Sequence, residues 1–220
     1  MFNFAQARTN MVDSQLRPNG VTNLNILDAM QSVLREDFVG SAQKSVAYMD
    51  GDLVLAEASN SRRFLIEPMA FARMLQAAEV NANDRVLDIG AATGYGAAIL
   101  SKLVKQVVAV ESDSGLAHAA RQNLAGLLNV TLNESDMAKG APQAGLFDLV
   151  IIEGRIEEVP NALFSQVKDG GRVVAAVGQQ DMAQCRIYKI SGKTHTQRSV
   201  FDISVAALPG FGMTKPSFAF

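Results

Sequence analysis

The segment Val86–Gly96 constrains the fold of this chain more than any other feature. It reads Val-Leu-Asp-Ile-Gly-Ala-Ala-Thr-Gly-Tyr-Gly, a short apolar run followed by a glycine-rich turn and the start of a helical pattern. Glycines let a backbone turn sharply and approach a ligand closely. In an open α/β sheet such a turn lies at the carboxyl ends of the strands, where ligands bind. The segment therefore predicts a buried strand that ends in a ligand-binding turn.

The remainder of the second half alternates strand-like and helical patterns. Apolar or β-branched runs that predict strands occupy residues 85–89, 106–110, 129–132, 147–152 and 170–177. Continuous apolar strands that alternate with helices indicate a parallel sheet covered on both faces. Two more runs, 185–190 and 199–208, have no helix between them and predict an antiparallel edge pair. We expect an α/β, Rossmann-like fold with a mostly parallel sheet of seven strands.

The first part of the chain has a different pattern. Apolar residues recur at helical spacing over residues 25–34, and Pro68 opens a second periodic segment, as proline does in a first helical turn. We therefore predict an N-terminal helical cap over residues 1–80 and a cofactor-binding core over residues 81–220.

Composition narrows the class of protein. Hydrophobic residues make up 48% and charged residues 19% of the chain, so it can bury a sizeable core. A net charge of −2 gives no field that favours nucleic acid or a membrane, and we expect neither as a partner. The single cysteine, Cys185, cannot form an internal disulfide or a zinc site alone, and it favours a reducing, cytoplasmic location. We expect no metal site, and His118 and His195 are predicted to be surface residues.

A carboxylate follows the second predicted strand. Glu111, with Ser112 after it, comes about 20 residues beyond the turn, where an acidic residue accepts hydrogen bonds from ribose hydroxyls. The sequence thus predicts a nucleotide ligand with Glu111 at its ribose.

The turn also indicates which nucleotide. A dinucleotide fingerprint would read G-x-G-x-x-G, but Ala92 stands at its second glycine. Asp88 precedes the turn, and a carboxylate suits a cationic sulfonium amino acid better than a pyrophosphate. This favours S-adenosylmethionine; a nicotinamide cofactor and a turn without a ligand are the alternatives. The residues predicted to line the cofactor here are Asp88, Gly90, Ala91, Ala92, Gly94 and Tyr95.

Another carboxylate follows the third predicted strand. Asp136 could accept a hydrogen bond from the adenine amino group, with Met137 against the ring. The alternative is that Asp136 only caps a turn.

The ordered motifs resemble those of the protein-L-isoaspartate O-methyltransferase family over most of the chain. The matching blocks are Met-Val-Asp-Ser-Gln-Leu-Arg (11–17), Ile-Leu-Asp-Ala-Met (26–30), Arg-Glu-Asp-Phe-Val (35–39), Ala-Tyr-Met-Asp (47–50), the turn at 86–95, and Gly-Gly-Arg-Val-Val (170–174). The resemblance implies methyl transfer from S-adenosylmethionine to the α-carboxyl group of isoaspartyl residues in damaged protein, and hence a protein or peptide substrate. Because that acceptor is already anionic, the rate would come from alignment and exclusion of water, and we predict no catalytic residue.

Four departures from the family pattern bear on the reaction. The family's Thr-Ile-Ser-x-Pro block, whose serine lies beside the reacting groups, is Phe64-Leu65-Ile66-Glu67-Pro68 here, and isoleucine cannot form the hydrogen bond. The usual Gly-Gln before that block is replaced by Ser61-Arg62-Arg63, and Ala92 stands where glycine is usual.

The fourth departure is Glu153-Gly154-Arg155, where the family has small neutral residues. Glu153 either contacts the cofactor or acceptor, or is solvated and paired with Arg155 or Arg62. A carboxylate near the acceptor would repel an anion. The sequence therefore leaves three functions open: an isoaspartyl methyltransferase, a methyltransferase with another acceptor, and a non-catalytic protein that binds S-adenosylmethionine. The oligomeric state is not predicted.

Overall fold

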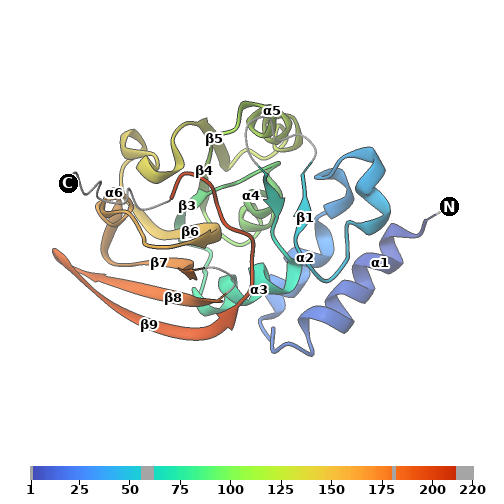
Figure 1. The fold of residues 1–220 in the computed structure, drawn as a ribbon, viewed down its shortest axis with the longest axis horizontal. Coiled ribbons are helices and arrows are strands. Elements are labelled where there is room, and N and C mark those ends of the chain that lie inside the picture. Colours follow the sequence, from blue (N-terminus) through green and yellow to red (C-terminus); the bar gives the residue numbers. More distant parts are fainter. Residues whose placement is uncertain (1, 56–61, 180–181, 212–220) are drawn as a thin grey trace, which may run out of the picture.

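A twisted sheet of seven strands forms the centre of the molecule in the computed structural model, which describes residues 2–55, 62–179 and 182–211 (Figure 1). Its strands are β3 (Arg85–Ile89), β4 (Gln106–Glu111), β5 (Val130–Glu134), β6 (Phe147–Ile156), β7 (Val167–Gln179), β8 (Met182–Ser191) and β9 (Thr194–Ile203). A separate pair consists of β1 (Leu53–Val54) and β2 (Phe64–Leu65), which run antiparallel.

The strand order is β5-β4-β3-β6-β7-β8-β9. Strands β3 to β7 are parallel, whereas β8 and β9 are antiparallel additions at one edge. The predicted mostly parallel sheet with an antiparallel edge pair is confirmed. Strands β4 and β5 lie on one side of β3, and β6 to β9 lie on the other. The strand order therefore reverses between β3 and β6, and a crevice for a ligand is expected at the carboxyl ends of these two strands.

Helices cover both faces of the sheet. They are α1 (Phe4–Asn10), α2 (Leu24–Ser32), α3 (Pro68–Ala77), α4 (Tyr95–Ser101), α5 (Ser114–Asn123) and α6 (Asn161–Phe164), with a π-helix η1 (Met11–Leu16) and 3-10 helices η2 (Arg35–Asp37), η3 (Ser41–Val46), η4 (Met137–Lys139) and η5 (Pro142–Ala144). Pro68 occupies the first turn of α3, and the Asn23 side chain caps α2 by accepting from two backbone N–H groups. No helix among the described residues is long and apolar enough to cross a membrane.

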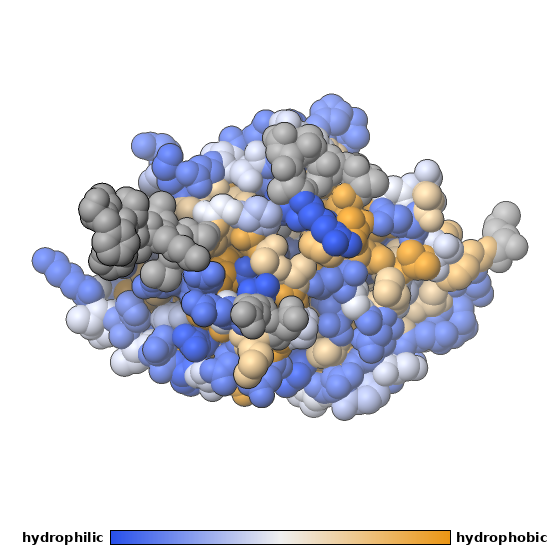
Figure 2. Space-filling model, in the orientation of Figure 1, coloured by the Kyte–Doolittle hydropathy of each residue, from blue (hydrophilic) through white to orange (hydrophobic). Residues whose placement is uncertain are grey.

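Two apolar clusters lie on the two faces. Alternate residues of one strand, such as Leu149 and Val150, belong to different clusters, as the period of two in a strand requires. The larger cluster joins the sheet to α3, α4, α5 and the N-terminal helices, which Figure 1 shows at one end of the molecule. This cluster contains Phe71 and Val86, which lie on either side of the predicted boundary at residue 80, so the cap and the sheet share one core. The division at that residue remains a prediction. The face in Figure 2 carries hydrophilic residues around its rim and apolar ones toward its middle.

The C-terminal strand differs from the prediction. It was expected at residues 199–208, but β9 ends at Ile203. The chain then turns back beside Arg155, whose N–H donates to the Ala206 carbonyl and whose carbonyl accepts from Leu208 N–H. Backbone pairing with the end of β6 therefore draws the apolar residues Val205 and Leu208 away from the edge and over the carboxyl ends of the strands (the red segment in Figure 1).

Candidate functional site

The glycine turn adopts the backbone conformation that its sequence requires. Gly90, Ala92 and Gly94 have φ angles of 85°, 51° and 95°, in the left-handed region that favours glycine. Gly94 is also the N-cap of α4, so the turn leads directly from β3 into that helix. At Ala92 a side chain occupies this conformation, which costs roughly 1–2 kcal/mol. The turn predicted from Val86–Gly96 is therefore formed at the carboxyl end of the central strand.

Glu111 lies at this turn. Its carboxylate Oε2 accepts from Ala92 N–H at 2.8 Å, and Oε1 accepts from the N–H groups of Ser112 and Asp113, each at 2.8 Å. The residue is fully buried. The structure thus places Glu111, the residue predicted to bind the ribose, beside the predicted glycine turn. Three backbone N–H groups hold its carboxylate in position.

An arginine that the sequence analysis did not assign to the site also binds Glu111. Arg63 Nη1 and Nη2 lie 2.5 and 2.7 Å from the two carboxylate oxygens, a bidentate pair. Arg63 is 2% exposed, and its Nη2 also lies 3.5 Å from the Gly90 carbonyl oxygen. Its guanidinium therefore lies between Glu111 and the first residue of the turn. The signal in the sequence was the Arg62-Arg63 pair in place of Gly-Gln.

Two buried carboxyl groups lie beneath the turn. Asp88 and Glu153 come from the ends of β3 and β6, and both oxygens of Asp88 and Oε1 of Glu153 are buried without an N–H or hydroxyl donor among the described residues. Burial raises the pKa of Asp88 to about 7, and burial together with the charge of Asp88 raises that of Glu153 well above its usual range. The pair therefore holds a proton between its carboxyl groups at neutral pH.

The position of Glu153 excludes one of its two predicted roles, and contact with the cofactor or acceptor stays a prediction. The residue is 6% exposed, and a Cβ atom at Gly96 would collide with its carboxylate, so Gly96 provides the space for it. It forms no ion pair with Arg155 or Arg62 among the described contacts. The solvated alternative is wrong, because the Glu153 side chain turns inward toward the first turn of α4.

Arg35 and Tyr95 connect the cap to this region. Arg35 is fully buried, donates to the carbonyls of Ala47 and Ile66 at 2.7 and 2.8 Å, and stacks over the Tyr95 ring at 4.6 Å. Burial lowers the pKa of its guanidinium. The Tyr95 side chain thus packs into the cap, beside Phe38, and only its backbone belongs to the turn.

The remaining predicted residues lie nearby. Asp136 is exposed and caps η4 by accepting from Ala138 N–H at 3.0 Å, while Met137 is buried. Capping is therefore present, and the adenine role stays a prediction. Ala91 is buried in the turn, and Leu208 packs so closely that a Cβ atom on Gly90 would lie 2.9 Å from its Cδ1.

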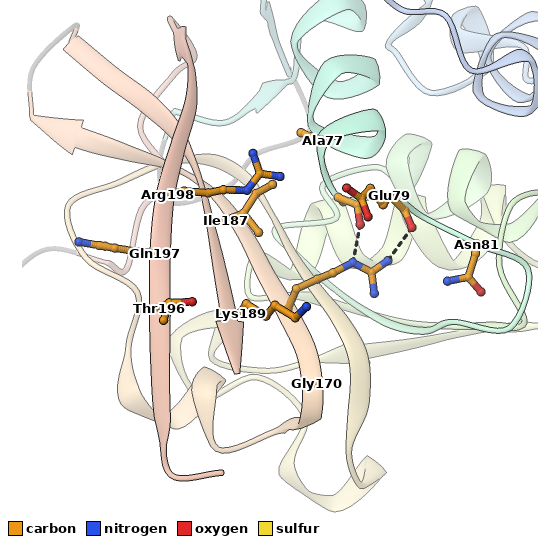
Figure 3. Close-up of a pocket in the computed structure, with 11 residues that line it drawn as sticks. Ala77, Glu79, Asn81, Gly170, Ile187, Lys189, Thr196, Gln197 and Arg198 are labelled. Atoms are coloured by element: carbon orange, nitrogen blue, oxygen red, sulfur yellow. Dashed lines mark hydrogen bonds between the residues drawn. The ribbon is translucent and has the colours of Figure 1, made fainter. Parts of the chain in front are cut away.

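Two of the cavities that lie outside the turn bear on the site. One of about 480 Å³ lies at the amino ends of the strands, between the end of α3 and strands β8 and β9, where Figure 3 shows Glu79, Lys189 and Arg198 on its walls. The other, of about 490 Å³, is lined by Phe64, Glu67, Asp52, Arg155 and the chain after β9. Only the second adjoins the segment that corresponds to the family's acceptor block.

Comparison with known proteins decides the family. The model for the family described as protein-L-isoaspartate(D-aspartate) O-methyltransferase matches residues 6–206. The protein-L-isoaspartate O-methyltransferase of Methylorubrum extorquens (strain PA1) is 39% identical over 175 residues, 79% of this chain and 75% of that protein. The chain belongs to the protein-L-isoaspartate O-methyltransferase family.

Solved structures agree with this assignment. A protein-L-isoaspartate O-methyltransferase superposes with a TM-score of 0.82 at 25% identity, over 93% of this chain and 67% of that one. A putative member from Plasmodium falciparum, solved with S-adenosyl-L-homocysteine, has the same fold with a TM-score of 0.76 at 14% identity, over 94% and 99% of the two chains. The predicted Rossmann-like methyltransferase fold is therefore confirmed.

The structure shows the surroundings of the residues that depart from the isoaspartyl methyltransferase pattern. Ile66 is 4% exposed and belongs to the larger apolar cluster, so no hydroxyl stands at this position. Phe64 is half-buried, with the Arg62 guanidinium 5.3 Å from the centre of its ring. The block that carries the family's serine thus begins here with the short strand β2 and continues to Ile66, whose carbonyl accepts from Arg35.

Proposed function

We propose that this chain is an S-adenosylmethionine-dependent methyltransferase that methylates carboxyl groups of isoaspartyl residues in protein or peptide substrates. The observation that carries the proposal is the glycine turn after β3, with the Glu111 carboxylate bonded to Ala92, in a chain that matches the family over residues 6–206. The low cysteine content favours the cytoplasm as its location.

The residues of the turn fit this cofactor. Within the part of the chain that the structure describes, both oxygens of Asp88 and Oε1 of Glu153 are buried without a donor other than the shared proton, and such groups favour a cationic ligand. Glu111 would hold the ribose, and Gly90, Ala91, Ala92 and Gly94 would hold the methionyl part. Ser112 and the exposed Asp136, with Met137, would flank the adenosine.

The bound cofactor would supply an electrophilic methyl group on a sulfonium. The chain's own contribution is then positioning: a turn fixed by backbone bonds, a covering segment at Leu208, and few exposed atoms around the turn. A carboxylate acceptor needs no base, so rate depends on in-line alignment and on exclusion of water.

A second acceptor class is favoured by one observation. The cavity beside Phe64 is lined by Asp52 and Glu67, and burial raises the pKa of Glu67 to about 7 while that of Asp52 is also raised. The two carboxyl groups outnumber Arg155 on this wall, and where they are ionised they disfavour an anionic acceptor and suit a neutral or cationic one. Methylation of another acceptor is therefore the second candidate.

Transfer of label from the methyl group of S-adenosylmethionine tests the proposal. An isoaspartyl peptide and the matching aspartyl peptide are compared, with a panel of amine and hydroxyl acceptors. Label in the isoaspartyl peptide alone supports the first candidate, and label only in another acceptor supports the second. Binding of S-adenosylhomocysteine without transfer to any acceptor indicates the non-catalytic alternative.

A further inference from the structure

The carboxylate that should receive the cofactor's ribose already has a full set of donors. Glu111 accepts five hydrogen bonds, three from backbone N–H groups and two from Arg63. A carboxylate offers about four lone-pair positions. Ribose hydroxyls can therefore bind Glu111 only if one of the present donors leaves.

Arg63 is the donor that can leave. The three N–H groups belong to Ala92, Ser112 and Asp113, whose backbones form the turn and the loop after β4. Arg63 instead reaches the site through a flexible side chain, from a segment whose carbonyl accepts from Leu55 N–H beside β1. Its guanidinium can rotate away without a change in the sheet or the turn.

The ion pair is strong enough to affect binding. Both partners are almost fully buried, at 2% and 0% exposure of the side chains, and the contact is bidentate. Once Arg63 leaves, Glu111 keeps its three backbone donors, so the ionised carboxylate remains satisfied. The exchange thus replaces the two charge-assisted hydrogen bonds from Arg63 by two hydrogen bonds from ribose hydroxyls. The free energy of the Arg63–Glu111 pair is lost on binding, and this loss lowers the affinity for the cofactor.

We propose that Arg63 is an internal competitor for the ribose-binding carboxylate, which the cofactor must displace from Glu111 in order to bind. The inference rests on the proposed function. Arg63 directly precedes the block Phe64–Pro68, which lines the cavity beside the turn, so its displacement links occupation of the cofactor site to the wall of the acceptor cavity. Arg63 thereby sets the affinity for the cofactor and keeps the Glu111 charge paired before the cofactor binds.

Titration calorimetry with S-adenosylhomocysteine tests the proposal. Arg63→Gln should bind about tenfold to a hundredfold more tightly than the wild type, the equivalent of a charged hydrogen-bond pair. Arg63→Lys, which retains one charged bond, should lie between them and serves if the glutamine variant does not fold. Arg62→Gln, at the exposed neighbouring arginine, is the matched control and should bind as the wild type does.

The outcomes separate the two proposals. Wild-type binding together with equal or weaker binding by both Arg63 variants would overturn the competitor role and leave the proposed function standing. An absence of binding by the folded wild type and by every variant would overturn both.

Discussion

Two arginine–carboxylate pairs, one partly buried and one fully buried, lie at opposite ends of the sheet and serve different purposes. At the amino ends, Arg172 pairs with Asp84 at 2.6 Å and also donates to the carbonyls of Ala78, Glu79 and Asp148. At the carboxyl ends, Arg63 pairs with Glu111 and makes one long contact with the Gly90 carbonyl. Arg172 binds backbone carbonyls at the end of α3 and in the sheet, so it joins these elements. Arg63 instead binds a carboxylate that is also expected to bind the ribose of the cofactor. The number of fixed backbone acceptors distinguishes a structural arginine from an exchangeable one.

The largest effect should follow from breaking the structural pair. Arg172→Met leaves Asp84 buried at 4% exposure without its cation and frees the carbonyls at the end of α3, so the free energy of unfolding should fall by about 3–5 kcal/mol. Urea denaturation measures this. Lys189→Met, on the exposed wall of the same cavity, is the control and should change little (Figure 3). Equal stability of the two variants would contradict the structural role of Arg172 and its difference from Arg63.

The next effect concerns chemistry at the carboxyl ends. Because Ile66 replaces the family's serine and provides no hydroxyl, methyl transfer to an isoaspartyl peptide should be slower than in a family member that carries the serine, by about a hundredfold to a thousandfold, or 2.7–4 kcal/mol. Single-turnover rates with labelled cofactor measure this. Equal rates in the two proteins would show that the hydroxyl is dispensable. Recovery of rate in Ile66→Ser would locate the cause, since Arg62, Arg63 and Phe64 also differ from the family pattern.

The buried carboxyl pair should make stability depend on pH. The pKa of Asp88 rises from an ordinary 3.8 to about 7 on folding, so the unfolded chain loses its proton first and the folded state becomes less stable as pH rises between these values. In Glu153→Gln the amide can donate to Asp88, and the variant should be more stable than the wild type at pH 8 by roughly 2–4 kcal/mol, with little difference near pH 4.

Chemical denaturation from pH 4 to pH 8 would measure this difference. Glu157→Gln, at an exposed position in the same segment, is the control and should follow the wild type. A wild type that gains stability relative to Glu153→Gln as pH rises would contradict the shared proton.

The sequence was sufficient for the fold and for the position of Glu111, because both depend on local patterns. Alternation of strands and helices predicts the sheet, and a fixed spacing places Glu111 beside the turn. Arg63 could not be placed in this way, since its contact with Glu111 joins residues 48 apart across the cap and the sheet. Leu208 was assigned to a strand because apolar alternation cannot show where an edge strand stops.

Glu153 was partly predictable. Strands β3 and β6 pair with Ile89 opposite Ile152. Asp88 is next to Ile89 and Glu153 is next to Ile152, so both carboxyl side chains point to the face opposite these two isoleucines. Alternation along β6 alone places Glu153 on the face of Leu149 and Ile151, which favours a buried side chain over a solvated one. The shared proton could not have been predicted, because it depends on the absence of nearby donors.

The central claim is that Glu111 is the ribose-binding carboxylate of an S-adenosylmethionine site, and the most direct test removes the competitor first. In the wild type, loss of Glu111 would remove both the ribose contact and the Arg63 pair, and the two effects would offset each other. The informative measurement is therefore calorimetric titration of S-adenosylhomocysteine into Arg63→Gln and into the double variant Arg63→Gln, Glu111→Gln. The control is Glu134→Gln in the same background, because Glu134 lies opposite Glu111 at the exposed end of β5. We predict that the double variant binds about tenfold to a hundredfold more weakly than Arg63→Gln, while the Glu134 control is unchanged. Equal affinity of the double variant and Arg63→Gln, with both proteins folded, would contradict the claim.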